Sequence, residues 1–148
     1  MNEERNGKGK EYYFSNSNLM FEGLYLNGER NGKGKENDYN YIFEGEYLNG
    51  VKNGKGKEFY KNGRLKFEGE YLNGKRWNGN GYNINGKLEF EIKDGKGYIK
   101  EYDFLDKLQF EGEYLNGVKN GKGKEYYYDG KLKFEGKYLN GQRNNIGK

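Results

Sequence analysis

Large and charged residues alternate along this chain with a period of two. In residues 43–48, FEGEYL, ring-bearing or small residues alternate with charged ones, which is typical of a β-strand with one covered face. Residues 49–54 are rich in Asn and Gly, which accept positive φ, so we expect a six-residue loop there. Residues 55–60 are expected to be the return strand, and Asn62-Gly63 a two-residue turn. Helix is not expected, because the chain has 26 glycines and no apolar stripe of helical period.

This hairpin pattern recurs along the whole chain. The segment FEGxYLNG begins at Phe21, Phe43, Phe67, Phe110 and Phe134, and a degenerate copy begins at Phe90. The connections are short, so consecutive strands should pair antiparallel. The predicted fold class is all-β, an elongated, twisted, single-layer antiparallel β-meander of consecutive hairpins. We expect one domain over residues 1–148, with a half repeat at 5–20, repeats starting at 21, 43, 67, 90 and 110, and a half repeat at 134–148.

The register expected from a six-residue loop places rings over glycines. Tyr47 then lies opposite Gly56 and Glu46 opposite Lys57, and residues that oppose each other share a face of the sheet. One face should carry tyrosine rings over glycines, and the other should carry Glu–Lys pairs. The equivalent predicted pairs are Tyr25 with Gly34, Tyr114 with Gly123, and Glu113 with Lys124.

One repeat departs from the pattern. Between Phe90 and Phe110 the loop shrinks to Asp94-Gly95, a predicted two-residue turn, and Ile92 replaces the usual glycine. Just before it stands Trp77, the only tryptophan of the chain. One interpretation is a repeat altered by drift, in which Trp77 fills a gap. The other is a local bend in the sheet that creates a partner site, with Trp77 as its anchor.

The composition argues against catalysis. The chain has no histidine and no cysteine, so the commonest general base and the thiolate nucleophile are absent. Ser15 and Ser17 are its only serines, and no histidine exists to activate them. We therefore expect no enzyme activity, no catalytic residue, no cofactor and no metal site.

Charge and hydropathy suggest where the protein acts. The chain carries 27 basic and 23 acidic side chains, a formal net charge of +4. No apolar run approaches the roughly 20 residues needed to span a bilayer, and no signal-peptide core follows Met1. The expected location is the cytoplasm, either free or peripheral at a membrane or the cytoskeleton.

The repeated segments also resemble a known family. FEGxYLNG followed by NGKGKE, at a spacing near 23 residues, is similar to the MORN repeat (membrane occupation and recognition nexus). Residues 59–65 and 126–132 also resemble the bacterial MORN-variant repeat. The family often has Tyr where Phe43 stands and His where Asn53 stands. The resemblance implies an elongated single-layer β-meander without intrinsic catalysis, which acts as an interaction module or scaffold.

A protein partner is the first binding hypothesis. A twisted sheet presents a groove lined by rings and glycines, in which an amphipathic helix or an extended peptide can lie. The candidate partner-binding residues are Tyr25, Tyr47, Tyr71, Tyr114, Tyr138, Trp77, Phe43, Phe67 and Phe110. The alternative is that these rings only pack between repeats.

Self-assembly and lipid binding are the other hypotheses. The strands near residues 7–14 and 134–139 are expected to leave open edges, through which copies could join head-to-tail into a homo-oligomer or filament. Cations expected in the loops could bind an anionic phospholipid surface, and the candidates are Lys33, Lys52, Lys75, Arg76, Lys119 and Arg143. Nucleic acid is not favoured as a partner, because the rings alternate with glycines in a structural pattern.

Overall fold

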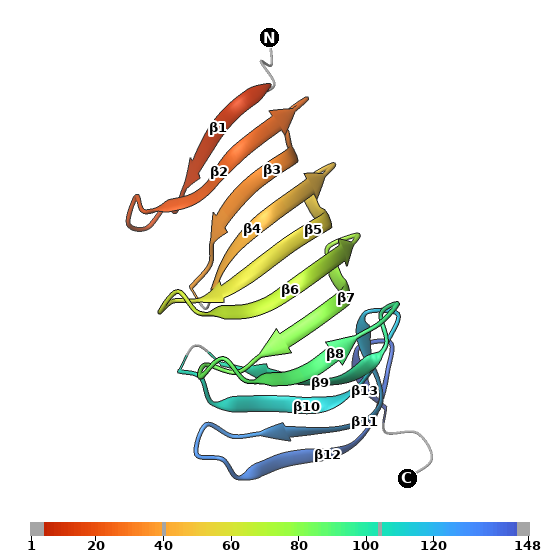
Figure 1. The fold of residues 1–148 in the computed structure, drawn as a ribbon. Coiled ribbons are helices and arrows are strands. Elements are labelled where there is room, and N and C mark those ends of the chain that lie inside the picture. Colours follow the sequence, from red (N-terminus) through yellow and green to blue (C-terminus); the bar gives the residue numbers. More distant parts are fainter. Residues whose placement is uncertain (1–4, 40, 104, 145–148) are drawn as a thin grey trace.

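The chain folds into a series of β-hairpins (Figure 1). The computed structural model describes residues 5–39, 41–103 and 105–144. These ranges contain no helix and thirteen strands. The strands are β1 (Gly7–Tyr12), β2 (Leu19–Leu26), β3 (Glu29–Asn37), β4 (Tyr41–Leu48), β5 (Val51–Tyr60), β6 (Leu65–Leu72), β7 (Lys75–Tyr82), β8 (Leu88–Ile92), β9 (Gly97–Tyr102), β10 (Leu108–Leu115), β11 (Val118–Tyr126), β12 (Leu132–Leu139) and β13 (Gln142–Asn144).

Consecutive strands pair antiparallel, as predicted, but they form two sheets. The first sheet has the order β1 to β8, and the second has the order β13-β12-β11-β10-β9. In Figure 1 the strands follow one another from the N-terminal end to the C-terminal end, and the second sheet continues beyond β8. The predicted meander of consecutive hairpins is confirmed, with one interruption between β8 and β9. The open edge predicted near 134–139 is partly covered, because Lys137–Leu139 pair with β13.

The six-residue loop predicted after Leu48 is wrong. Asn49 and Gly50 have φ angles of 50° and 89°, the signature of a type I′ two-residue turn. The return strand therefore begins at Val51. Gly54 lies inside this strand with a φ of 104°, in the stretch where the pairing of β4 with β5 shifts register. The same pair of positive φ angles occurs at Asn27-Gly28, Asn73-Gly74, Asp94-Gly95, Asn116-Gly117 and Asn140-Gly141, which confirms the turn predicted at 94–95.

The turns at the other ends of the hairpins are longer than predicted. The Gly63 amide donates to the Tyr60 carbonyl at 2.9 Å, and the Tyr60 amide donates to the Arg64 carbonyl at 2.8 Å. Gly63 has a positive φ of 91°. Asn62-Gly63 thus belongs to a three-residue loop with a bulged glycine, not to a two-residue turn.

The two-residue turn shifts the register, so the predicted ring–glycine pairs are off by one hairpin. Gly45 pairs with Gly56, and Phe43 pairs with Glu58. A Cβ on Gly56 would lie 2.6 Å from the Phe43 ring and 2.9 Å from the Tyr71 ring. Gly34, Gly56 and Gly123 therefore each lie beneath the phenylalanine of their own hairpin and the tyrosine of the next. The tyrosine contacts observed are Tyr25 with Gly9, Tyr47 with Gly34, Tyr71 with Gly56 and Tyr138 with Gly123.

The rings form a packed row on one face of each sheet, and we call this face the ring face. Phe21, Phe43 and Phe67 have no exposed surface. The Phe43 ring meets the Tyr47 ring at 5.6 Å and the Tyr71 ring at 5.1 Å, both edge to face, a favourable aromatic geometry. The buried rings thus take the place of an aliphatic core.

The Glu–Lys pairs lie on the opposite face, as predicted, but with other partners. Lys57 forms its ion pair with Glu68 at 3.5 Å, and its ladder partners are Glu44 and Glu68. The Glu46 carboxylate instead accepts the Lys55 amide at 2.9 Å, and Glu113 accepts the Lys122 amide. These charged side chains are half-exposed, where an ion pair contributes at most about 1 kcal/mol.

The interruption between the sheets lies where Ile92 replaces a glycine. Between β8 and β9, the one bridge in the described residues joins Lys93 to Lys96, which flank the Asp94-Gly95 turn. Ile92 and Ile99 are 3% and 1% exposed. Most other repeats have a glycine beneath a ring at this position, whereas here a buried isoleucine side chain packs into the core where the two sheets separate.

The row of two-residue turns continues across this interruption. The Gly95 amide donates to the Trp77 carbonyl at 2.8 Å, and the Gly117 amide donates to the Gly95 carbonyl at 2.9 Å. A Cβ on Gly95 would lie 2.6 Å from the Trp77 ring. The sheet is interrupted in the irregular repeat, and Trp77 packs on the turn of that repeat.

Candidate functional site

Charged groups on the ring face link most hairpins to the strand or hairpin before them. The Glu58 carboxylate on β5 accepts the hydroxyl of Tyr71 on β6, and two hydrogen bonds from the Arg76 guanidinium on β7, at 2.7 and 2.8 Å. The Arg76 guanidinium also lies 4.7 Å from the centre of the Phe67 ring, within the range of a cation–π interaction. We call these four residues an interlock cluster.

Interlock clusters recur along both sheets. The Glu11 carboxylate accepts hydrogen bonds from the Tyr25 hydroxyl at 2.5 Å and from the Arg30 guanidinium at 2.9 Å. The Glu125 carboxylate accepts a hydrogen bond from the Tyr138 hydroxyl and a bidentate pair from the Arg143 guanidinium at 2.8 and 2.9 Å. Paired guanidinium contacts of this kind are among the stronger hydrogen bonds in proteins. In a reduced form of the cluster, Lys119 lies 4.1 Å from the centre of the Phe110 ring and 3.9 Å from Glu101.

The electrostatics of these clusters suit structure and binding. Burial alone would raise the pKa of Glu58, but the charge and hydrogen bonds of Arg76 and the Tyr71 hydroxyl outweigh it and bring that pKa to about 2. The hydrogen bonds from Arg143 likewise lower the pKa of Glu125 to about 2, against the effect of burial. Carboxylates with such a low pKa are weak general bases at neutral pH.

A second set of side chains reaches the ring face through β-bulges. In β6, Phe67 pairs with Glu58 and Leu65 pairs with Phe59, which leaves Lys66 as the extra residue. Lys66 lies 5.1 and 5.4 Å from the ring centres of Tyr41 and Tyr60. Strict alternation would have placed Lys66 on the opposite face, and a bulge is a known means of re-aiming a side chain.

The bulge recurs at the residue before the repeat phenylalanine. The ladders skip this residue at Met20, Glu89, Gln109 and Lys133 as well. Met20 contacts Arg30, and Lys133 lies 5.8 Å from the Tyr127 ring centre. These positions carry a different type of side chain in most repeats, whereas the rings beside them are repeated.

Lys52 occupies the cation position of its repeat without an acidic partner. It donates to the Tyr41 hydroxyl at 3.1 Å and lies 4.5 Å from the Phe43 ring centre. The equivalent carboxylate, Glu36, is engaged by Tyr47 at 2.7 Å and by Arg30 at 3.1 Å. Within the described residues, Lys52 and Lys66 form no ion pair.

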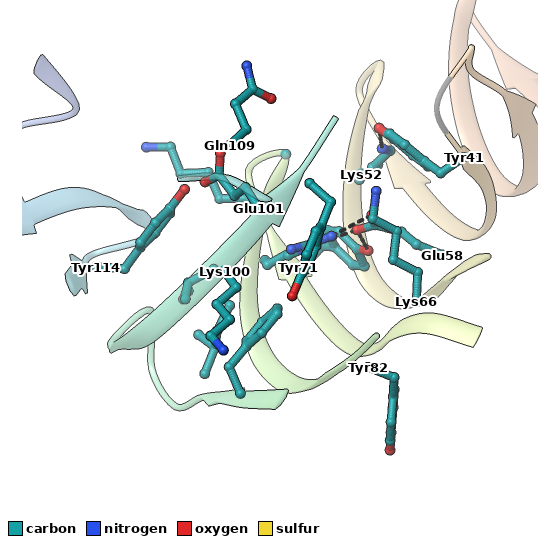
Figure 2. Close-up of a pocket in the computed structure, with 18 of the residues that line it drawn as sticks. Tyr41, Lys52, Glu58, Lys66, Tyr71, Tyr82, Lys100, Glu101, Gln109 and Tyr114 are labelled. Atoms are coloured by element: carbon teal, nitrogen blue, oxygen red, sulfur yellow. Dashed lines mark hydrogen bonds and ion pairs between the residues drawn. The ribbon is translucent and has the colours of Figure 1, made fainter. Parts of the chain in front are cut away.

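The two sheets enclose a pocket of about 450 Å³ on the ring face, which we call the junction pocket. Figure 2 shows Lys52, Lys66 and Tyr41 on one side of it, and Glu101, Gln109 and Tyr114 of the second sheet on the other. Among the described residues, its basic lining is Lys52, Lys66, Lys75, Arg76 and Lys100, and its acidic lining is Glu58 and Glu101.

The structure separates the predicted partner-binding residues into two groups. Tyr25, Tyr47, Tyr71 and Tyr138 are at most 5% exposed, and Phe43, Phe67 and Phe110 at most 1%. These rings pack between repeats, and the cations of the clusters cover several of them. Tyr114 is half-buried and lines the junction pocket, whereas Trp77 is half-buried outside its lining.

The predicted lipid-binding cations do not lie in loops. Lys52, Arg76, Lys119 and Arg143 are each the second residue of a strand and lie over a phenylalanine ring. Lys75 is exposed at the start of β7, and Lys33 is exposed on the opposite face. The loops were expected to be long, and the short type I′ turns place these residues in strands instead.

Three important residues were missed by sequence reasoning. Glu58 recurs as the last residue of NGKGKE, so its periodic spacing could have marked it as part of the packed face. Tyr41 lies two residues before Phe43 in an unbroken part of the ladder, so the two-residue period could have placed it on the ring face. Lys66 could not be found this way, because a bulge breaks the two-residue period on which the assignment of faces depends.

Within the described residues there is no group of three or more His, Cys, Asp or Glu side chains that could hold a metal ion. Nor does any helix in that part of the chain have the length and apolar character needed to cross a membrane.

Comparison with known proteins gives a family match. The MORN repeat family model matches residues 21–41, 43–63, 67–78 and 110–131, about half of the chain. A search of curated protein sequences found no match.

Proposed function

Because the chain belongs to the MORN repeat family, whose members are generally protein- or membrane-interaction modules, we propose that it is a non-enzymatic module that binds a protein partner on its ring face. The partner contributes a helix or an extended segment that lies across the strands. Recognition modes of this kind rely on side-chain pockets and grooves.

The observation that carries the proposal is the set of bulge residues. The bulges direct side chains onto a face on which the phenylalanine and tyrosine rings recur from repeat to repeat. Met20, Lys66, Glu89 and Gln109 differ in size and charge, and Lys133 is a second lysine. A partner segment lying across them therefore meets a different chemical group at most repeats. The buried rings beneath supply a rigid support, and the bulge residues supply specificity.

The charge of this face indicates the character of the partner. In each full interlock cluster the arginine head lies above a ring with its carboxylate beside it, while Lys52 and Lys66 have no carboxylate partner in the described residues. The segment that fits this face is therefore amphipathic and carries acidic side chains.

Site-directed photo-crosslinking tests the proposal without removing a packed group. A photoreactive residue is placed at Met20, Gln109 or Lys133 on the ring face, and at Lys33 or Lys57 on the opposite face. We expect one protein from an extract of the source cells to crosslink at the ring-face positions and not at the control positions. The complex should then be reconstituted with the purified partner. Equal crosslinking from both faces, or crosslinks from the opposite face only, would contradict the proposal.

A further inference from the structure

We propose that the junction pocket is a binding site for a small organic anion, whose carboxylate or phosphate group lies between Lys52 and Lys66. This inference goes beyond the proposed function, because it concerns a soluble ligand and needs no protein partner.

The position of the pocket is the first argument. Strands β4 to β8 of the first sheet form one side, and β9 and β10 of the second sheet form the other, where β10 contributes Gln109 and Tyr114. A volume of about 450 Å³ lies within the range of small-molecule sites, roughly 300–1,000 Å³. The pocket lies where β8 separates from β9, so residues of both sheets line it.

The two lysines are the second argument. The cations at the equivalent position of neighbouring repeats, Arg30 and Arg76, each have a carboxylate at 2.9 Å or less. Lys52 lacks one because Glu36 is engaged by Arg30 and Tyr47. A half-buried ammonium that lacks an acidic partner is costly to keep charged, and an anionic ligand would supply the missing charge.

Lys66 is aimed at this position by a bulge. Its ammonium and that of Lys52 lie 5.1 and 5.0 Å from the centre of the same ring, that of Tyr41. Burial lowers the pKa of Lys66, in line with the absence of an ion-pair partner. Both ammonium groups thus gather beside one tyrosine whose hydroxyl already contacts Lys52.

The remaining lining selects the kind of anion. Glu58 and Glu101 would repel an anion, but each has a basic partner of its own, Arg76 and Lys119. Tyrosine rings, including Tyr60, Tyr102 and Tyr114, supply flat apolar walls with polar tips. A small organic molecule with an acidic group and a planar part fits this lining better than a bare inorganic ion.

The test is a titration of the full chain observed by NMR, with its lysines labelled by ¹³C-methylation. The probes are citrate, inorganic phosphate and benzoate, and sodium chloride at matched ionic strength is the control. We expect the Lys52 and Lys66 signals to shift saturably with at least one organic anion, and Lys66 to titrate at higher pH in its presence. Shifts that follow ionic strength alone would overturn the proposal.

Two variants and one matched control complete the test. Lys52→Gln and Lys66→Gln should each weaken binding by about tenfold, the usual effect of losing a charge-assisted contact. Lys33→Gln on the opposite face should bind as the unaltered chain does. Thermal unfolding of each variant checks that it remains folded. If Lys33→Gln lost as much affinity as Lys52→Gln and Lys66→Gln, the result would count against the site.

A vesicle-binding measurement distinguishes a soluble anion from a lipid headgroup as the source of the acidic group. Vesicles of phosphatidylcholine with phosphatidylserine are tested beside the soluble anions. Saturable binding of a soluble anion supports the proposal. Binding to the vesicles with no saturable response to any soluble anion would overturn it in favour of a lipid surface. The crosslinking test of the partner uses no added anion, so the two proposals can fail separately.

Discussion

The Tyr71 hydroxyl on β6 donates its hydrogen bond to the Glu58 carboxylate on β5, the last strand of the preceding hairpin. Arg76, on the strand after Tyr71, reaches the same carboxylate. Three consecutive strands are therefore joined by side chains as well as by their backbone ladders. Glu58 is the buried charged residue of the described core, at 4% exposed, so its partners decide whether its burial is stabilising.

Stability should fall in acid through Glu58. Its pKa is about 2 in the folded chain, below the ordinary value of 4.5, so its contribution is complete above pH 4.5 and is lost as the pH falls toward 2. The shift corresponds to roughly 3 kcal/mol at neutral pH. We expect Glu58→Gln to lower the free energy of unfolding by about that amount, and to flatten its dependence on pH between about pH 5 and pH 2. Urea unfolding over this pH range measures both effects.

The control for this prediction is Glu44→Gln. Glu44 is half-exposed on the opposite face, 3.7 Å from Lys35, and its removal should cost less than about 1 kcal/mol. An acid profile of Glu58→Gln that matches the unaltered chain would show that the interlock cluster does not govern acid stability.

Gly56→Ala should destabilise the chain by about 1 to 3 kcal/mol, the usual cost of overpacking. The added Cβ would lie 2.6 Å from the Phe43 ring and 2.9 Å from the Tyr71 ring. Lys57→Ala, at the next position on the opposite face, should be nearly neutral. The double variant Gly56→Ala with Phe43→Leu should lose less stability than the two single changes added together, because leucine frees ring space. Strict additivity in chemical denaturation would contradict the ring-over-glycine packing.

Replacement of Asn73 should depend on backbone conformation. Asn73 has a φ of 50° in its type I′ turn, and Asn and Gly tolerate this conformation better than alanine. We expect Asn73→Ala to cost about 1 kcal/mol more than Asn73→Gly, measured as the difference in urea midpoints. Equal stability of the two variants would mean that the turn is not of this type.

Ile92 should be essential although it breaks the repeat. Ile92→Gly restores the residue found at this position in the other repeats, but it removes a side chain that is 3% exposed. We expect a loss of about 3 to 5 kcal/mol, against about 1 kcal/mol for Ile92→Val. Unaltered stability of Ile92→Gly would favour the interpretation of this repeat as a product of drift.

The architecture could be predicted from the sequence because two periods agree. The two-residue alternation gives strands, and the repeat near 23 residues gives consecutive hairpins. The register could not be predicted, because residues 49–54 contain two Asn-Gly pairs, and either a two-residue or a six-residue loop suits them. The first pair forms the turn, while Gly54 keeps a positive φ inside the ladder.

The candidate site was harder to predict than the fold. Glu58 stands in a charged segment typical of a solvated strand face, yet three hydrogen bonds from Tyr71 and Arg76 allow it to be buried. Lys66 reaches the ring face only through a bulge, which no alternation pattern reveals. The junction pocket depends on how two sheets separate around Ile92, a long-range packing effect.

The interlock clusters point in one direction along the array, and this gives the stack a polarity. A hairpin removed from the N-terminal side takes away an acceptor, and the next tyrosine and arginine are left without their carboxylate. A hairpin removed from the C-terminal side instead leaves a carboxylate that water can solvate at the new edge. Deletions of equal length should therefore be unequally tolerated, and loss of structure should spread more readily from the N-terminal end.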